Sequence, residues 1–394
     1  MKTISNYRTI YSGSSRRICS KFNPNNSEEV FRNDSTSQLL GRAVLFKVLA
    51  NNTFVTHAVK TANSILRGNS SGYMRAGVEF FVKRSVFRHF CAGENFHECS
   101  NLAREMLTRC RVTTIADCSS EDLVDEDGFE MNLKEKMNLL LQISDDGDNG
   151  IKFVPLKCTS LIDSGVLERL TAKVLMMQQT DIGAMDLEDR EKFLAGIVRF
   201  ERICSLAQSK NLTILLDAEE SSRQPAVEVL ARILFEKFNH RGSCPVVYNT
   251  YQTYLKRTPA ALIRDMNIAR DSGYVFAVKL VRGAYSQTEL AVFRDSPHGS
   301  RENPLWPTKA ETDLEYDRAI EAILQSIASK ETKSDGLNDK PFVMIATHNK
   351  VSIEKAVETM RVLGIPNDHR NIHFAQILGM SDHLTTALAD SGSC

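Results

Sequence analysis

A regular alternation of short apolar runs and helix-like stretches fills the chain beyond residue 110. Each run is rich in β-branched or aromatic residues, ends in polar residues, and is followed by apolar residues at helical spacing. This alternation predicts a parallel sheet, because two parallel strands need a crossover connection, usually a helix. The predicted strands are VTTIAD (112–117), IKFVPLK (151–157), LTILLDAEE (212–220), PVVYNTYQ (245–252), YVFAVKLVRGAY (274–285), FVMIATHN (342–349) and IHFAQILGM (372–380).

The polar ends of these strands recur at steps near one strand–helix unit. Asp217 to Asn249 is 32 residues, and Asn249 to Lys279 is 30. No GxGxxG or GxxxxGK[ST] motif opens any unit, which disfavours the two commonest folds with a phosphate-binding loop. We therefore expect a (β/α)8 TIM-like barrel, in which functional side chains lie at the carboxyl ends of the strands. The polar residues at those ends are Lys157, Asp217, Asn249, Lys279, Arg282, Thr347, His348, Asn349 and Gln376.

Two units are longer than the others and must carry insertions. Residues 162–200 have helical spacing, which predicts an extra helix. Residues 286–340 contain Pro297, Pro304 and Pro307, which predict a long loop.

The N-terminal residues differ in composition from the rest of the chain. Residues 1–27 contain five Lys or Arg residues, many Ser and Thr, and no acidic residue, which favours a mitochondrial transit peptide over a secretory signal. The alternative is a disordered tail. Residues 28–109 predict a helical region, followed by the barrel over residues 110–394. Within the N-terminal region we predict helices over residues 37–49, 73–90 and 95–108, the first capped by Thr36 or Ser37. Their apolar faces suit packing on the barrel or contact with a membrane surface.

Charge and cysteine content exclude several classes of protein. Lys plus Arg and Asp plus Glu are both 49, so no overall field favours a nucleic acid partner. Nine cysteines without a CxxC pair argue against a disulfide framework or a zinc ribbon and predict reduced thiols. The acidic stretches 121–130 and 145–150 lack the spacing of an EF-hand and are expected to be solvated loops. His369 and His373 lack an acidic third ligand at fixed spacing, so we expect no metal site.

Five strand-end motifs together resemble a known family. LLDAEE, VYNTYQTYLK, VKLVRGAY, ATHN and FAQILGMSD, in this order, resemble the proline dehydrogenase (proline oxidase) family of mitochondrial FAD enzymes. STSQLLGRAVLFKVL and FRHFCAGE are similar to the helical region of the eukaryotic members, so the resemblance covers about residues 36–390. It implies oxidation of L-proline to 1-pyrroline-5-carboxylate, the first step of proline catabolism to glutamate. It also implies electron transfer to a quinone or the respiratory chain, on the matrix side of the inner mitochondrial membrane.

The resemblance also implies roles for individual residues. Hydride transfer to a flavin requires a clamp for the substrate carboxylate and cations near the flavin ring, and cationic strand ends are present. By resemblance, Lys157 faces the substrate carboxylate, Asp217 orients groups around the amine, and Tyr285 forms a wall of the pocket. The implied FAD contacts are Asn249 at the flavin ring, Lys279 and Arg282 as the nearby cations, Thr347, His348 and Asn349 at the ribityl and phosphate portion, and Gln376 and Ile377 around the ring.

The family pattern continues beyond the last residue of this sequence. Members follow the GMSD segment with an eighth strand and a final helix that carries two adjacent arginines, which clamp the proline carboxylate. This sequence stops at Cys394, so we expect a barrel without its last strand and helix, and poor turnover of proline. The alternative function is that of a non-catalytic family member that binds flavin or a partner, and a pyridoxal- or metal-dependent barrel enzyme is a distant third.

Overall fold

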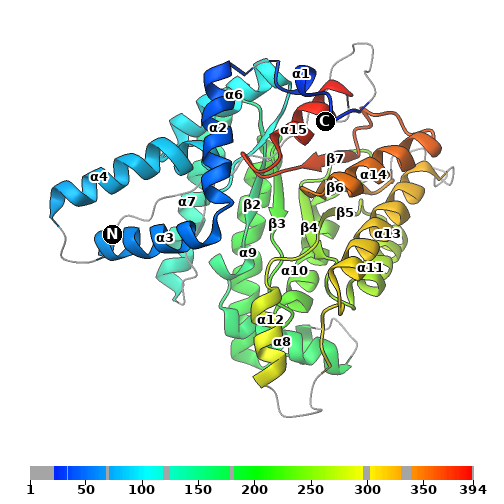
Figure 1. The fold of residues 1–394 in the computed structure, drawn as a ribbon. Helices are drawn as coiled ribbons and strands as arrows, with labels where there is room; N and C mark the ends of the chain where they lie inside the picture. The colour runs from blue at the N-terminus through cyan, green and yellow to red at the C-terminus, as the bar shows by residue number, and fades with distance from the viewer. Residues whose placement is uncertain are drawn as a thin grey trace.

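A curled parallel sheet lies at the centre of the molecule. Helices cover its outer face, and a group of N-terminal helices lies to one side (Figure 1). This computed structural model describes residues 22–32, 34–67, 71–118, 125–177, 182–295, 302–329 and 339–392. Most of the predicted transit peptide, residues 1–21, therefore lies outside the described residues.

All seven predicted strands are present and form one sheet in chain order. Every neighbouring pair is parallel, as the alternation of strands and helices predicted. Within the described residues β1 and β7 are the two edges of the sheet, so the structure contains seven strands of a TIM-like fold. The strands are β1 (Thr114–Ile115), β2 (Ile151–Leu156), β3 (Thr213–Leu216), β4 (Val247–Gln252), β5 (Ala277–Val281), β6 (Phe342–Ala346) and β7 (Ile372–Ala375).

Helices form the crossovers between the strands. The extra helix predicted within residues 162–200 is confirmed, because α8 and the start of α9 occupy that segment. The helices are α7 (Glu126–Asp145), α8 (Ser164–Met177), α9 (Leu187–Ser209), α10 (Gln224–Phe238), α11 (Thr258–Ser272), α12 (Ser286–Asp295), α13 (Lys309–Ala328), α14 (Lys350–Val362) and α15 (Asp382–Asp390), with short 3₁₀ turns η2 (Cys158–Ser160) and η3 (Ile182–Ala184).

The long loop predicted over residues 286–340 is wrong for most of its length, since α12 and α13 lie there. Pro304 and Pro307 fall between the two helices, where they interrupt nothing. Directly after them Thr308 caps α13, and Glu311 completes a capping box with it. The prediction overweighted the prolines and missed this helix start.

Alternation along the strands divides the apolar side chains between two faces. An inner cluster includes Phe153, Tyr248 and Ala277, while the larger outer cluster, packed under the helices, includes Val247, Val278 and Leu280. Successive strand residues point to opposite faces, which explains the division. The same alternation determines which polar residues face the interior of the curled sheet.

The N-terminal region is helical, as predicted, but it contains one more long helix than predicted. The cap of helix α2 is Ser35, one residue before the predicted Thr36, and Ser35 forms a capping box with Gln38. Helix α3 was not predicted, and the stretch 73–90 divides into α4, a π-helical turn η1 and α5. The elements are α1 (Ser27–Val30), α2 (Thr36–Leu49), α3 (Asn52–Arg67), α4 (Gly72–Val82), η1 (Lys83–Phe87), α5 (Arg88–Phe90) and α6 (Phe96–Cys110).

Two contacts join the N-terminal helices to the last strand–helix unit. The Nε2 atom of His89 lies 2.9 Å from the carbonyl oxygen of Gly379, in the turn after β7. Arg32 forms an ion pair with Asp390 at 2.6 Å. Gly379 has a φ of +78°, and a Cβ atom there would lie 2.5 Å from the His89 carbonyl oxygen, so only glycine fits this turn.

The described residues also bear on the acidic stretches, the cysteines, metal clusters and membrane spans. Part of the acidic stretch 121–130 is not a loop: Asp125 caps α7, and the acids after it favour the positive end of the helix dipole. The described cysteines are free thiols. Within the described part of the chain, no cluster of side chains suits a metal ion and no helix is long and apolar enough to cross a membrane.

Candidate functional site

Asp217 and Lys279 form an ion pair at the carboxyl ends of the strands. Asp217 follows β3, and its backbone N–H donates to the carbonyl of Leu156 at 2.8 Å. Lys279 lies in β5 in register with Thr250, on the face that carries Ala277 and the inner cluster. The Lys279 Nζ atom donates to Oδ1 of Asp217 at 2.6 Å. Only 10% of the Lys279 side chain and 30% of the Asp217 side chain is exposed, so a cation and a carboxylate are held together in a partly desolvated site.

Lys157 lies at the carboxyl end of β2, the strand next to β3, and its side chain is exposed. It directly follows β2 and precedes the 3₁₀ turn η2, whose backbone fixes its position. The acids after β3 do not lie in the first turn of a helix. Helix α10 begins only at Gln224, and its first turn contains no acid. Asp217 therefore belongs to the strand-end group and not to a helix N-terminus.

The segment after β5 extends over the strand ends and is fixed there by polar contacts. The Tyr285 hydroxyl donates to the Ala218 carbonyl at 3.2 Å, which places the predicted wall residue beside the Asp217 loop. Glu289 of α12 is buried and accepts hydrogen bonds from the backbone and the hydroxyl of Ser221, at 2.5 Å each. The side chain of Gln252 bridges the two segments, donating to the Glu219 carbonyl and accepting from the backbone N–H of residue 284.

Arg282 forms the most extensive polar network near the strand ends. Its guanidinium group donates to Asp313, Thr347 and Ser352, at 2.5, 2.6 and 2.8 Å. The group also lies 4.3 Å above the centre of the Tyr316 ring, a cation–π contact. Arginine has five N–H donors, so two have no acceptor among the described residues. A fixed guanidinium with free donors suits an anionic group.

The residues after β6 and β7 form a connected group. The Gln376 amide donates to the Thr347 carbonyl at 3.3 Å, and the backbone N–H of Ile377 donates to Nε2 of His348 at 2.9 Å. Burial lowers the pKa of His348, which fits the neutral ring that this acceptor role requires. Asn349 caps α14 and accepts hydrogen bonds from the N–H groups of residues 351 and 352. The helix N-terminus thus opens beside Arg282.

Asn249 does not lie with the other predicted site residues. It is paired with Val278 and is therefore one residue out of phase with Lys279 on the neighbouring strand. Its side chain interacts with Tyr251, whose hydroxyl donates to Asp265 of α11. The register places Asn249 on the helix-facing side of the sheet, and its predicted contact with a flavin ring stays a prediction.

Sequence reasoning missed Gln252, Glu289, Asp313 and Ser352. Gln252 was identifiable, since it is the last polar residue of a predicted strand. The other three lie on helices, and nothing in their spacing indicates contacts with residues after β3 or β5. Long-range partners of this kind become visible only when the crossover helices are placed.

The donor set fits an elongated anionic cofactor such as FAD. Lys279 and Arg282 supply two cations, and the N-terminus of α14 adds a positive dipole end. Thr347 and His348 add polar side chains between these groups and β7. A cation near the strand interior and an arginine beside a helix N-terminus are suited to a redox ring and a phosphate group, respectively.

Comparison with known proteins identifies the family of this chain. A family model described as proline dehydrogenase matches residues 102–394, more than half of the chain. Hydroxyproline dehydrogenase of Homo sapiens is 35% identical over 226 residues, covering 57% of this chain and 47% of that protein. The mitochondrial proline dehydrogenase 1 of Dictyostelium discoideum is 27% identical over 416 residues, covering 94% of this chain and 68% of that protein. The mitochondrial proline dehydrogenase 1 of Homo sapiens is 31% identical, over 60% of this chain and 38% of that protein. The chain thus matches about half of the length of the first of these relatives.

A solved structure shares the fold. Proline utilization A (PutA) from Bdellovibrio bacteriovorus, inactivated by N-propargylglycine, superimposes with a TM-score of 0.68 at 18% identity. The match covers 92% of this chain and 36% of the PutA chain. At this identity the likeness shows the fold, and it supports the TIM-like arrangement of the curled sheet.

Proposed function

The chain belongs to the proline dehydrogenase family, an oxidoreductase family, and on this premise we propose that it oxidises L-proline to 1-pyrroline-5-carboxylate with FAD as cofactor. The observation that supports this most directly is the Asp217–Lys279 ion pair, 2.6 Å long, at the strand ends. The pair is near Lys157 on one side and the Arg282 network on the other. FAD, when bound, accepts the hydride that proline loses from the carbon next to its nitrogen.

The residues divide this work by position. Lys157 provides a cation for the substrate carboxylate, as an exposed lysine at an open strand end can do. Asp217 orients the substrate amine, and its own orientation is fixed by Lys279. Tyr285 and the segment of α12 held by Glu289 exclude water from one side of the pocket. Arg282, Thr347 and His348 hold the phosphate and ribityl portions of the cofactor.

We also propose that electrons pass to a quinone in a membrane and that the protein acts on the matrix side of the inner mitochondrial membrane. Two of the relatives named above are mitochondrial by name. Helices α2, α3 and α4, which we call the N-terminal arm, add an observation from this chain. Neither α2 nor α4 has a buried residue, and α3 and α4 project away from the sheet (Figure 1).

The N-terminal arm combines exposed apolar side chains with positive charge. Tyr73, Phe80 and Phe81 are 94%, 67% and 71% exposed. Residues 36–82 contain five Lys or Arg residues and one acid, Glu79, a net charge of +4. Exposed aromatic groups with surrounding cations suit the interface of a membrane with anionic lipids. This surface therefore supports peripheral contact with a membrane.

The proposed function is tested by loading the purified protein with FAD and incubating it with L-proline and a soluble quinone. We expect a yellow protein that turns over proline slowly, in line with the poor turnover expected from the sequence, and we expect its product to react with o-aminobenzaldehyde as a pyrroline does. A folded protein that takes up no FAD, or that is loaded with FAD and forms no product from proline or hydroxyproline, contradicts the proposal.

A further inference from the structure

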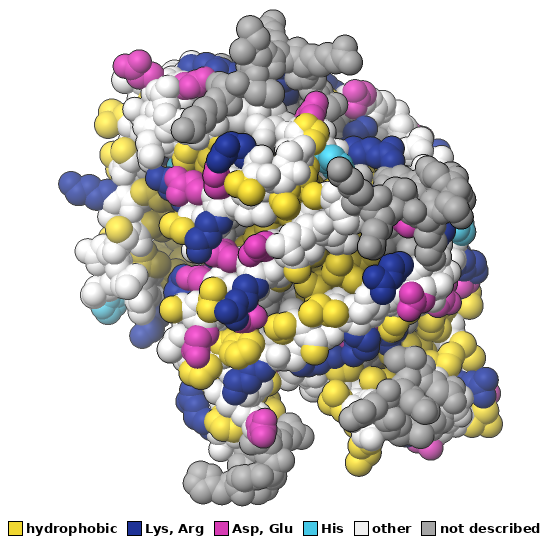
Figure 2. Space-filling model, turned by 90° about the vertical axis from the view of Figure 1, so that its right-hand side faces the viewer, with side chains coloured by type: hydrophobic (Ala, Val, Ile, Leu, Met, Phe, Trp, Pro, Cys, Tyr) yellow, Lys and Arg dark blue, Asp and Glu magenta, His cyan; other side chains and the backbone are white. Residues whose placement is uncertain are grey.

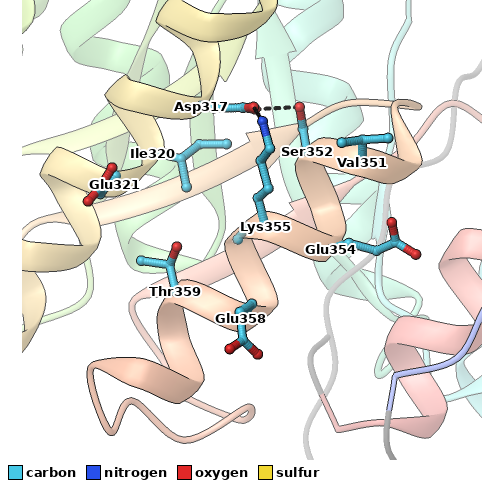
Figure 3. Close-up of a pocket in the computed structure, with 10 residues that line it drawn as sticks. Asp317, Ile320, Glu321, Val351, Ser352, Glu354, Lys355, Glu358 and Thr359 are labelled. Carbon is cyan, nitrogen blue, oxygen red and sulfur yellow. Dashed lines mark hydrogen bonds and ion pairs between the residues drawn. The ribbon is translucent and has the colours of Figure 1, made fainter.

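A groove between α13 and α14, on the outer side of the sheet, has polar side chains that connect it to Arg282. Its volume is about 420 Å³, and its walls include Asp317 and Glu321 of α13 and Lys355 of α14. Figure 3 shows Asp317 joined by dashed lines to Ser352 and to Lys355. Lys355 donates to Oδ2 of Asp317 at 2.6 Å, and Ser352 donates to Oδ1 at 2.5 Å.

Ser352 joins this pair to the strand ends. Its hydroxyl group is buried, donates its single proton to Asp317, and accepts a hydrogen bond from Nη2 of Arg282 at 2.8 Å. The direction of the hydroxyl is therefore fixed by the carboxylate behind it, because a serine hydroxyl otherwise rotates to suit its neighbours. Without the Asp317 carboxylate, the acceptor lone pairs of Ser352 lose their fixed direction toward Arg282.

The charged side chains of this cluster leave a net positive charge beside the strand ends. Asp313 accepts from Lys309 at 2.5 Å as well as from Arg282, and Asp317 accepts from Lys355 at 2.6 Å. Three cations and two carboxylates leave a net charge of +1. On the surrounding face, seen in Figure 2, basic and acidic side chains are interspersed, and neither kind forms a large area. The positive charge near α14 is therefore local to Arg282.

We propose that Asp317 is a positioning residue for the cofactor site: through the Ser352 hydroxyl it fixes the direction of the Arg282 guanidinium and thereby strengthens binding of FAD. This inference rests on the proposed function, in which Arg282 faces FAD, and it adds a residue that lies outside the strand ends. Asp313 holds one edge of the guanidinium directly, and Asp317 holds the other edge through Ser352. Tyr316 supports its face.

The variants Asp317→Asn and Ser352→Ala test this relay in the full chain, with the dissociation constant of FAD measured by fluorescence quenching. Both should weaken FAD binding about tenfold, the loss expected when a charge-assisted hydrogen bond is misdirected. The prediction for Asp317→Asn separates two explanations. The variant removes a negative charge, so an effect of charge alone tightens binding of the anionic cofactor, whereas loss of positioning weakens it.

Two controls complete the design. Glu321→Gln removes the same charge from the same groove without touching the relay, and it should bind FAD within about twofold of the wild type. Ser352→Thr keeps a hydroxyl and should restore affinity relative to Ser352→Ala. If both Asp317→Asn and Ser352→Ala bind FAD with wild-type affinity, the relay is overturned. This holds also if the two variants only have a lower melting temperature. A wild-type protein that binds no FAD contradicts the proposed function instead, so the two failures are distinguishable.

Discussion

Single side chains at the strand ends carry the proposed chemistry, and their partners determine what each can do. Asp217 and Lys279 come from different strands and are partly removed from water, where a charge left without its partner is costly. Lys157 forms no such ion pair with the described residues and remains exposed. The ion pair is therefore a fixed element of the site, and Lys157 is available to a ligand.

Replacement of either substrate-facing residue should reduce activity while the cofactor stays bound. Lys157→Ala and Asp217→Ala should each lower kcat/KM for proline by about tenfold or more, the effect of losing one charge-assisted contact. Steady-state kinetics with a quinone acceptor, together with the flavin absorbance of each variant, is the measurement. Lys152→Ala, an exposed lysine near the start of the same strand, is the control. Unchanged kinetics in both variants rejects their roles.

His373 should make the fold sensitive to mild acid. Its ring faces the interior of the curled sheet, edge-on to Phe153 at 5.3 Å, and burial lowers its pKa to about 4. The unfolded chain has a histidine pKa of about 6.5, so the unfolded state binds the proton first and stability falls as the pH drops from about 6.5 to 4. The loss from this group is at most about 3 kcal/mol. Urea unfolding at several pH values should show this slope in the wild type and in His97→Gln, and a smaller slope in His373→Gln, where His348 and the other partly buried histidines with lowered pKa still contribute. The same slope in all three proteins contradicts the assignment.

At the level of secondary structure, the strands were predictable and some helices were not. Strands such as β3 and β6 are buried, so they appear as continuous apolar runs with sharp polar ends. Helix α13 begins at Thr308, directly after two prolines that suggested a loop. The phase of Asn249 within β4 depends on the register with β5, a tertiary property that a strand-end motif does not specify. The partners of Arg282 on α13 and α14 were hidden for the same reason.

The turn after β7 should depend on glycine for its contact with the N-terminal helices. Gly379→Ala combines a φ of +78° with a Cβ 2.5 Å from the carbonyl of His89. Gly364→Ala is the matched control, since Gly364 has a φ of +70° and nothing within 4 Å of the added Cβ. The control should lose about 1 kcal/mol of stability from backbone strain, and Gly379→Ala about 2 kcal/mol or more. Equal losses in chemical denaturation would show that the His89 contact adds nothing.

At the scale of the whole molecule, the curled sheet presents its polar strand ends while the N-terminal arm extends to one side (Figure 1). The arm is expected to bind membranes through its exposed aromatic side chains and through its positive charge. Replacing Phe80 and Phe81 by serine should weaken binding to vesicles that contain cardiolipin by about tenfold or more, because burial of each ring contributes about 1.5 to 3 kcal/mol. Sedimentation with vesicles measures this.

Leu187→Ser is the control for the arm, since Leu187 is 72% exposed but lies on α9. It should bind vesicles as the wild type does. Binding to neutral phosphatidylcholine vesicles should be weaker than binding to anionic ones, and high salt should reduce the difference. Equal binding of the arm variant and the wild type contradicts the assignment of this surface.

The central claim is that the strand ends of this chain form a site where proline reduces bound FAD. The most direct measurement is the flavin absorbance of the FAD-loaded protein after anaerobic mixing with L-proline, because a single turnover needs no electron acceptor. In the wild type we predict loss of the oxidised-flavin absorbance band at about 450 nm, and in Asp217→Ala slow or incomplete loss of the same band. A folded, FAD-loaded wild-type protein whose absorbance does not change with proline contradicts the account.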